Sequence, residues 1–148
     1  MANLAGKRLM KDSALVDTCI LVYLIDKRES AKHEKAKEWF HSLSEMDRFF
    51  VSIQNLREFS NIALKKSTFL PEEINQFVQL FAARFKLLFD GIEDIFTANE
   101  ISGRKRFWDA MLAATMKRHS INLILTENIK DFKNFKGIEA KNPLEQWV

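Results

Sequence analysis

The sequence predicts a single α/β domain in which helices flank a short, mostly parallel central sheet. Three observations lead to this prediction. Short apolar runs of strand length alternate along the chain with longer amphipathic segments of helical period. The chain has 148 residues, 47% of them hydrophobic, and 13 Phe side chains are available to fill one core. Only four Gly and two Pro argue against a turn-rich all-β fold and against long linkers.

The predicted strands are short and apolar, and each is separated from the next by a helix. The first covers residues 14–16 and ends at Asp17, an acid inside the otherwise apolar run ALVDTCILVYLID. Four further runs complete the predicted sheet, at residues 48–52, 86–89, 122–126 and 137–140, the last as an edge strand. Sites in such sheets form at the carboxyl ends of the strands, which is where Asp17 and the segment 126–128 (TEN) are expected.

The predicted helices carry apolar stripes and recognisable terminal signals. Ser52 is a candidate cap for the helix over 53–66. Pro71, followed by Glu72 and Glu73, gives the proline and the acids typical of a first helical turn. The other helices are predicted to start at Ile20 and to cover residues 30–46, 71–85, 92–102 and 107–120.

Other features of the sequence bear on the location of the protein and on its partners. Residues 1–12 are expected to form a basic N-terminal extension without the apolar core of a signal peptide, and residues 13–148 the domain. No apolar run approaches the roughly 20 residues that span a bilayer. The single Cys19 cannot form an internal disulfide, which predicts a packed thiol and a cytoplasmic location. A net charge of +3 permits an anionic partner such as nucleic acid.

Acidic residues are the main candidates for chemistry. Asp17 is expected to be buried, so its carboxylate must be paired, hydrogen-bonded, bound to a metal or protonated. Glu58 shares a helix face with Asn55 and Asn61, and Asp109 leans toward the apolar side of the helix over 107–120. Asp131 follows the strand at 122–126 in the loop TENIKDF. Each of these three acids also has an ordinary reading, as a surface, first-turn or loop residue.

Histidine chemistry is disfavoured by the spacing of the three histidines. His33, His41 and His119 are scattered along the chain and are predicted to lie on the surface. This pattern argues against a transition-metal site and against a histidine-based ribonuclease.

The order of the acidic blocks resembles the PIN-domain family, especially its VapC-type ribonuclease toxins. The run LVDTCILVYLID is similar to the opening strand and helix of that family, and VSIQNLREFSNIALKK to its second block. The run FWDAMLAATMKRHSINLILTENIKDF resembles the third and fourth blocks, and GIEAKNPLEQWV the usual tail. The resemblance covers residues 13–148. Each motif is loose alone, but four blocks in the family's order make accident a poor explanation.

The resemblance implies a set of site residues. Asp17, Glu58 and Asp109 match the three near-invariant acids of the family, as catalytic residues and metal ligands. The fourth position is open between Asp131, which we favour, and Asn128, a neutral alternative. Further candidates are Thr18 and Thr126 as accessory groups, and Arg104, Lys105 and Arg106 as contacts to an RNA backbone. Cys19 departs from the family, which more often has Asn or Ser there.

The implied activity is that of a metal-dependent endoribonuclease. Mg²⁺ or Mn²⁺ would neutralise the charge that develops at phosphorus, while water attacks in line and leaves a 5′-phosphate and a 3′-hydroxyl. The resemblance further implies the toxin of a type II toxin–antitoxin system, a homodimer and a small antitoxin partner that fills the acidic groove.

Two other readings stay open. A catalytically weak or inactive PIN-like module for RNA or protein binding fits Asn128 at one acid position. A phosphoacceptor domain would pair Asp12 with Asp17, but it requires a Lys after a late strand, where this chain has Thr-Glu-Asn.

Overall fold

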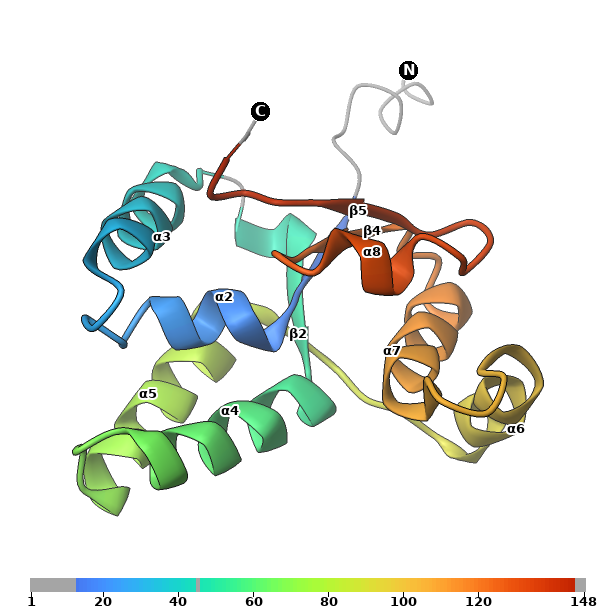
Figure 1. Cartoon of the computed structure of the whole chain (residues 1–148), viewed down its shortest axis with the longest axis horizontal. Helices are drawn as coiled ribbons and strands as arrows, with labels where there is room; N and C mark the ends of the chain where they lie inside the picture. Colours follow the sequence, from blue (N-terminus) through green and yellow to red (C-terminus); the bar gives the residue numbers. More distant parts are fainter. Residues whose placement is uncertain (1–12, 45, 146–148) are drawn as a thin grey trace.

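The computed structural model describes residues 13–44 and 46–145 of the chain (Figure 1). The predicted basic extension at residues 1–12 lies outside the described residues. Five strands form one sheet in the order β3-β2-β1-β4-β5, and every neighbouring pair is parallel. The strands are β1 (Ala14–Val16), β2 (Phe49–Ser52), β3 (Lys86–Leu88), β4 (Leu123–Leu125) and β5 (Glu139–Lys141).

Seven α-helices are present in the described part of the chain, and they connect the strands. They are α2 (Thr18–Tyr23), α3 (Ser30–Ser42), α4 (Ile53–Lys66), α5 (Pro71–Arg84), α6 (Ile92–Ile101), α7 (Phe107–Arg118) and α8 (Ile129–Phe132). Figure 1 shows α2, α3, α4 and α5 on one side of the sheet and α6 and α7 on the other. The predicted α/β fold with a parallel central sheet is therefore confirmed.

Both faces of the sheet are buried, and the alternation along each strand explains how. On β1, Ala14 and Val16 belong to the core beneath α2–α5, while Leu15 belongs to the core beneath α6 and α7. On β4, Ile124 joins Leu15, and its two neighbours face the opposite core. Strands covered on both faces read as continuous apolar runs, which is why the sequence shows them so clearly.

The strand order places a topological switch point between β1 and β4. From β1 the chain builds outward through β2 and β3, and then returns to lay β4 against the other side of β1. Val16 pairs with Leu125 at the ends of these two strands, so that the next residues, Asp17 and Thr126, emerge side by side. The crevice at such a point is where open parallel sheets bind their ligands.

Several boundaries shift by one or two residues from the sequence prediction, and three differences are more substantial. The helix predicted over 30–46 ends at Ser42, because Leu43 is extended, and a separate 3₁₀ helix covers Met46–Arg48. The short α8 lies in a segment predicted as loop. The edge strand β5 covers Glu139–Lys141 instead of 137–140.

The predicted surface position of His33 is wrong. Its side chain is only 6% exposed, and its Nδ1 lies 2.8 Å from the carbonyl oxygen of Tyr23. His33 shares a face of α3 with the buried Ala36 and Phe40, and this face packs toward the core. The charged neighbours of His33 in the sequence occupy the other face and suggested exposure.

None of the helices in the described part of the chain is both long enough and apolar enough to cross a membrane.

Candidate active site

Asp17 stands where β1 passes into α2. It caps α2, and its Oδ1 accepts a hydrogen bond from the backbone N–H of Thr18 at 2.8 Å. From the neighbouring strand end, the Thr126 hydroxyl donates to Asp17 Oδ2 at 2.8 Å. Asp17 is 8% exposed, and Thr126 is fully buried. The predicted burial of this carboxylate is therefore observed, and the hydrogen bonds fix its orientation.

Asn55 lies in the first turn of α4, directly after β2, and its side chain contacts the Asp17 carboxylate. Ser52 caps α4 as predicted, and its Oγ accepts the backbone N–H of Asn55 at 3.0 Å. The Asn55 Oδ1 in turn accepts the backbone N–H of Ser52 at 3.1 Å, which completes a capping box. The amide nitrogen of Asn55 is thereby directed at Asp17 Oδ1, 3.4 Å away, and at Thr18 Oγ1, 3.1 Å away.

Glu58 lies one turn further along α4 and contacts the same cluster. The Thr18 hydroxyl donates to Glu58 Oε1 at 2.7 Å. Gln54 Nε2 donates to Glu58 Oε2 at 3.4 Å and to the backbone oxygen of Trp108 at 3.1 Å. Gln54 therefore links the Glu58 carboxylate of α4 to the start of α7, which carries Asp109.

The other two candidate acids, Asp109 and Asp131, are carried by α7 and α8. Asp109 lies in the first turn of α7, and Asp131 on the short α8. Arg106 Nη1 donates to the backbone oxygen of Asp131 at 2.7 Å and lies 3.8 Å from its Oδ1. Asn128 is exposed, and its backbone N–H donates to the Thr126 hydroxyl at 3.0 Å. Arg104 and Lys105 are exposed in the preceding loop.

The acids influence each other electrostatically. Burial raises the pKa of Asp17 from 3.8 to about 6; the charges of Glu58 and Asp109 add to this, and hydrogen bonds from Thr126 and Thr18 oppose it. Burial also raises the pKa of Asp109, with contributions from Asp131 and Glu58 and opposition from Arg106. All four predicted acids are thus brought into one interacting group.

A family model described as the PIN domain matches residues 14–138. The chain belongs to the PIN-domain family. The resemblance noted in the sequence is thereby confirmed.

Solved structures share this PIN fold. A toxin–antitoxin complex from Klebsiella pneumoniae has 22% identity and a TM-score of 0.64, with 88% of this chain and 98% of the other covered. DNA-bound VapBC from Salmonella typhimurium has 22% identity and a TM-score of 0.65, with coverage of 90% and 99%. The sarcin–ricin loop cleaving toxin VapC20 from Mycobacterium tuberculosis has 16% identity and a TM-score of 0.66, with coverage of 82% and 94%. No curated protein matches the sequence.

The donor set of this PIN domain fits a hard divalent cation. The converging side chains are carboxylates, and oxygen is the ligand that Mg²⁺ and Mn²⁺ prefer. Among the residues that the structure describes, no three His, Cys, Asp or Glu side chains form a preformed metal cluster. An arrangement in which one or two carboxylates bind directly and water supplies the other ligands is typical of Mg²⁺.

Cys19 lies against the acidic group but is a poor nucleophile. Its Sγ accepts the backbone N–H of Glu127 at 3.4 Å and lies 3.9 Å from Asp17 Oδ2. Burial, reinforced by the charge of Asp17, raises the pKa of the Cys19 thiol to about 11. The thiol is therefore protonated at neutral pH, in agreement with the predicted packing role.

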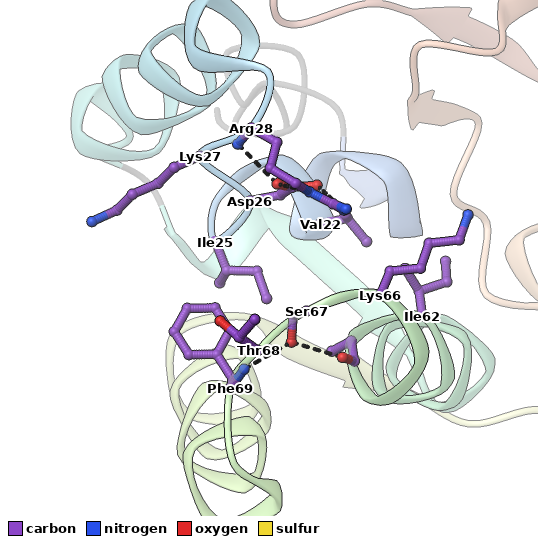
Figure 2. Close-up of a pocket in the computed structure, with 11 residues that line it drawn as sticks. Val22, Ile25, Asp26, Lys27, Arg28, Ile62, Lys66, Ser67, Thr68 and Phe69 are labelled. Atoms are coloured by element: carbon purple, nitrogen blue, oxygen red, sulfur yellow. Dashed lines mark hydrogen bonds and ion pairs between the residues drawn. The ribbon is translucent and has the colours of Figure 1, made fainter.

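A separate pocket of about 430 Å³ lies at the far ends of α2 and α4 (Figure 2). Ile25 and Phe69 point into it from opposite sides, and Asp26 forms an ion pair with Arg28 at its edge, with 2.8 Å between carboxylate and guanidinium. None of the four candidate acids lines this pocket.

Two residues of the site were not recognised in the sequence. Gln54 is not among the residues that the sequence predicts for the site, and Asn55 is identified there only as a neighbour of Glu58 on the helix face. The Ser-x-x-Asn spacing at Ser52 is a capping-box pattern that could have indicated Asn55. Gln54 gives no such signal, because its contact with the Trp108 backbone oxygen depends on how α7 packs against α4.

Proposed function

We propose that this PIN domain is a metal-dependent endoribonuclease that hydrolyses RNA phosphodiester bonds. The observation that carries the proposal is the state of Asp17. Among the described residues, the hydrogen bonds to this carboxylate come only from uncharged groups. Burial raises its pKa to about 6, and the charges of Glu58 and Asp109 add to the rise. A cation from solution would relieve this repulsion.

We propose a role for each of the four acids. Asp17 and Asp109 are the main ligands for Mg²⁺ or Mn²⁺, and Glu58 and Asp131 complete the site directly or through water. When bound, the ion would stabilise charge at the phosphoryl oxygens and lower the pKa of a water molecule. Thr126 and Asn55 hold Asp17 in orientation, and Thr18 does the same for Glu58.

Three basic residues near the acidic group are proposed to contact the phosphates of the RNA backbone. Arg106 already contacts Asp131, so it reaches the acidic group itself. Arg104 and Lys105 are exposed just ahead of α7 and are free of ion pairs with described residues. Their charges would attract phosphates toward a site that is otherwise acidic.

The cellular role that we propose is that of the toxin in a type II toxin–antitoxin pair, acting as a homodimer in the cytoplasm. Support comes from the fold neighbours, two of which are a toxin–antitoxin complex and a VapBC complex. The cognate antitoxin is expected to place a segment in the acidic groove. Coexpression with the protein encoded beside it would test this role through copurification and loss of cleavage.

The activity is tested with labelled single-stranded RNA, with and without Mn²⁺ or Mg²⁺. Wild type should cleave only with metal, and Asp109→Asn should not cleave. Glu100→Gln, an exposed acid on α6, is the matched control and should cleave like wild type. If wild type and Asp109→Asn are equally inert with every metal, the inactive binding-module reading replaces the nuclease.

A further inference from the structure

A second pocket lies beside the four candidate acids. The proposed nuclease activity gives no role to most of the residues that line it. It has a volume of about 340 Å³, which lies within the range of small-ligand sites. Its lining comes from one face of α4, from the segment after β3 and from the start of α7. The lining residues are Gln54, Arg57, Glu58, Asn61, Asp90 and Trp108.

Trp108 is the unusual member of this lining. Its side chain is 64% exposed, although an indole is costly to leave in water and is normally covered. The ring packs edge to face against Phe107, with 5.1 Å between the centroids, and the Trp108 backbone oxygen is held by Gln54. The indole is therefore a supported aromatic surface that faces solvent.

Trp108 also lies next to two of the candidate catalytic acids, Glu58 and Asp109. It precedes Asp109 in the sequence, and Gln54 donates to both its backbone oxygen and Glu58. Whatever lies against the indole is thus adjacent to the phosphate that the acids would act upon. Gln54 therefore links Glu58 to the residue that carries the indole, and Asp109 directly follows that residue in the chain.

The polar groups of the pocket suit a nucleotide. Gln54, Arg57, Glu58 and Asn61 are spaced three and four residues apart, so they line one face of α4. Arg57 is exposed and makes no ion pair with any described residue, so its guanidinium is available for a phosphate. Asp90 and Asn61 provide acceptor and amide groups for the edge of a base.

We propose that the Trp108 pocket binds one unpaired RNA base by stacking on the indole, next to the phosphate to be cleaved. The inference rests on the proposed ribonuclease function and adds to it a stacking position for one base, at Trp108 beside the acidic group. Aromatic side chains recognise single strands in this way, with little dependence on the base, because every base has a π face. A duplex would keep its bases stacked and would gain nothing from Trp108.

The test measures binding of a labelled oligoadenylate to the full chain in EDTA, so that metal-dependent cleavage does not interfere. Trp108→Ala should weaken binding about tenfold, the effect expected for one lost stacking contact. Trp108→Phe should retain most of the affinity. Phe96→Ala is the matched control, because this α6 aromatic is 60% exposed and does not line the pocket.

A second ligand identifies what the indole recognises. A base-free ribose-phosphate strand of the same length should bind wild type and Trp108→Ala equally. The proposal is overturned if Trp108→Ala binds oligoadenylate like wild type, if it loses the same factor with the base-free strand, or if wild type binds no RNA. In the first of these cases the exposed indole serves another contact, such as a protein partner.

Cleavage kinetics separate this proposal from the nuclease proposal. With Mn²⁺ present, Trp108→Ala should raise KM for single-stranded RNA and leave kcat within a few-fold of wild type. If wild type cleaves and Trp108→Ala has the same KM, the pocket proposal fails and the nuclease stands. If wild type never cleaves but the binding difference is found, the pocket stands and the nuclease proposal fails.

Discussion

Two buried aspartates in this chain are treated in opposite ways. Asp94, in the first turn of α6, is 1% exposed, and Asp17 is 8% exposed. Asp94 receives two hydrogen bonds from the Arg118 guanidinium, at 2.8 and 2.9 Å, and others from Gly91 N–H and the Thr115 hydroxyl. Burial opposes its ionisation, but these bonds outweigh burial and lower the pKa of Asp94.

Asp17 accepts a similar number of hydrogen bonds, but its pKa is raised where that of Asp94 is lowered. Its hydrogen bonds come from Thr18, Thr126 and Asn55, all uncharged, and its charged neighbours are acids. The fold can therefore neutralise a buried carboxylate, and does so between α6 and α7, where the role is structural. At the end of β1 the described residues provide no such cation, which is the arrangement expected of a site that binds one from solution.

The largest expected effect separates the two aspartates by activity. Asp17→Asn should reduce metal-dependent RNA cleavage at least about 100-fold, because a ligand of the ion is worth several kcal/mol of transition-state stabilisation. Asp94→Asn, measured per folded molecule, should cleave within a few-fold of wild type. Equal losses in both variants, with both folded, would remove the distinction.

The next effect separates them by stability. Asp94→Asn should lower the free energy of unfolding by about 2 kcal/mol, because the charge-assisted hydrogen bonds from Arg118 are lost. Asp17→Asn should leave the free energy of unfolding at pH 7 unchanged or higher, because it removes a buried charge without a cationic partner. Urea unfolding followed by circular dichroism measures both. A strongly destabilised Asp17→Asn would mean that Asp17 has a structural role.

A third effect concerns pH. The pKa of Asp17 is about 6 in the folded chain and 3.8 as its ordinary value, so the folded state takes up a proton first as the pH falls. Wild type should therefore gain about 1 kcal/mol of stability relative to Asp17→Asn between pH 7 and pH 5. Asp94 has the opposite sign: its contribution is present above pH 3.8 and is lost as the pH falls below that value. Parallel pH curves for wild type and Asp17→Asn would contradict the raised pKa.

The smallest effect uses a matched pair of threonines. Thr126 donates to Asp17 at 2.8 Å, and Thr115 donates to Asp94 at 3.0 Å. Thr126→Val should raise the pKa of Asp17 further, by up to about one unit, and move the acidic limb of the cleavage pH profile upward. Thr115→Val should lower stability and leave that profile in place. A profile that moves equally in both variants would exclude a specific effect on Asp17.

The same contrast explains what the sequence could predict. Asp17 stood out because an acid inside an apolar strand is conspicuous, and the order of Glu58, Asp109 and Asp131 pointed to a shared site. The strands were predictable because both faces of the sheet are buried. The sequence gives no comparable signal for Asp94, because its partner Arg118 lies 24 residues later on another helix.

The misses share one physical cause, which is packing between distant segments. His33 is buried because α3 lies against the core, and a charged sequence around it gives no sign of this. Gln54 acquires its contact with the Trp108 backbone oxygen from the packing of α7 against α4. The short α8 has only four residues, too few to show a helical period.

The central claim is that the acidic group around Asp17 binds a cation from solution, whereas Asp94 is already paired with Arg118. The most direct measurement is the thermal unfolding of wild type, Asp17→Asn and Asp94→Asn at pH 7, with and without Mn²⁺. A ligand that binds only the folded state raises stability in proportion to the logarithm of its concentration above Kd. We predict a rise for wild type and Asp94→Asn and none for Asp17→Asn. The same response in all three proteins, or no response in wild type, would contradict the account.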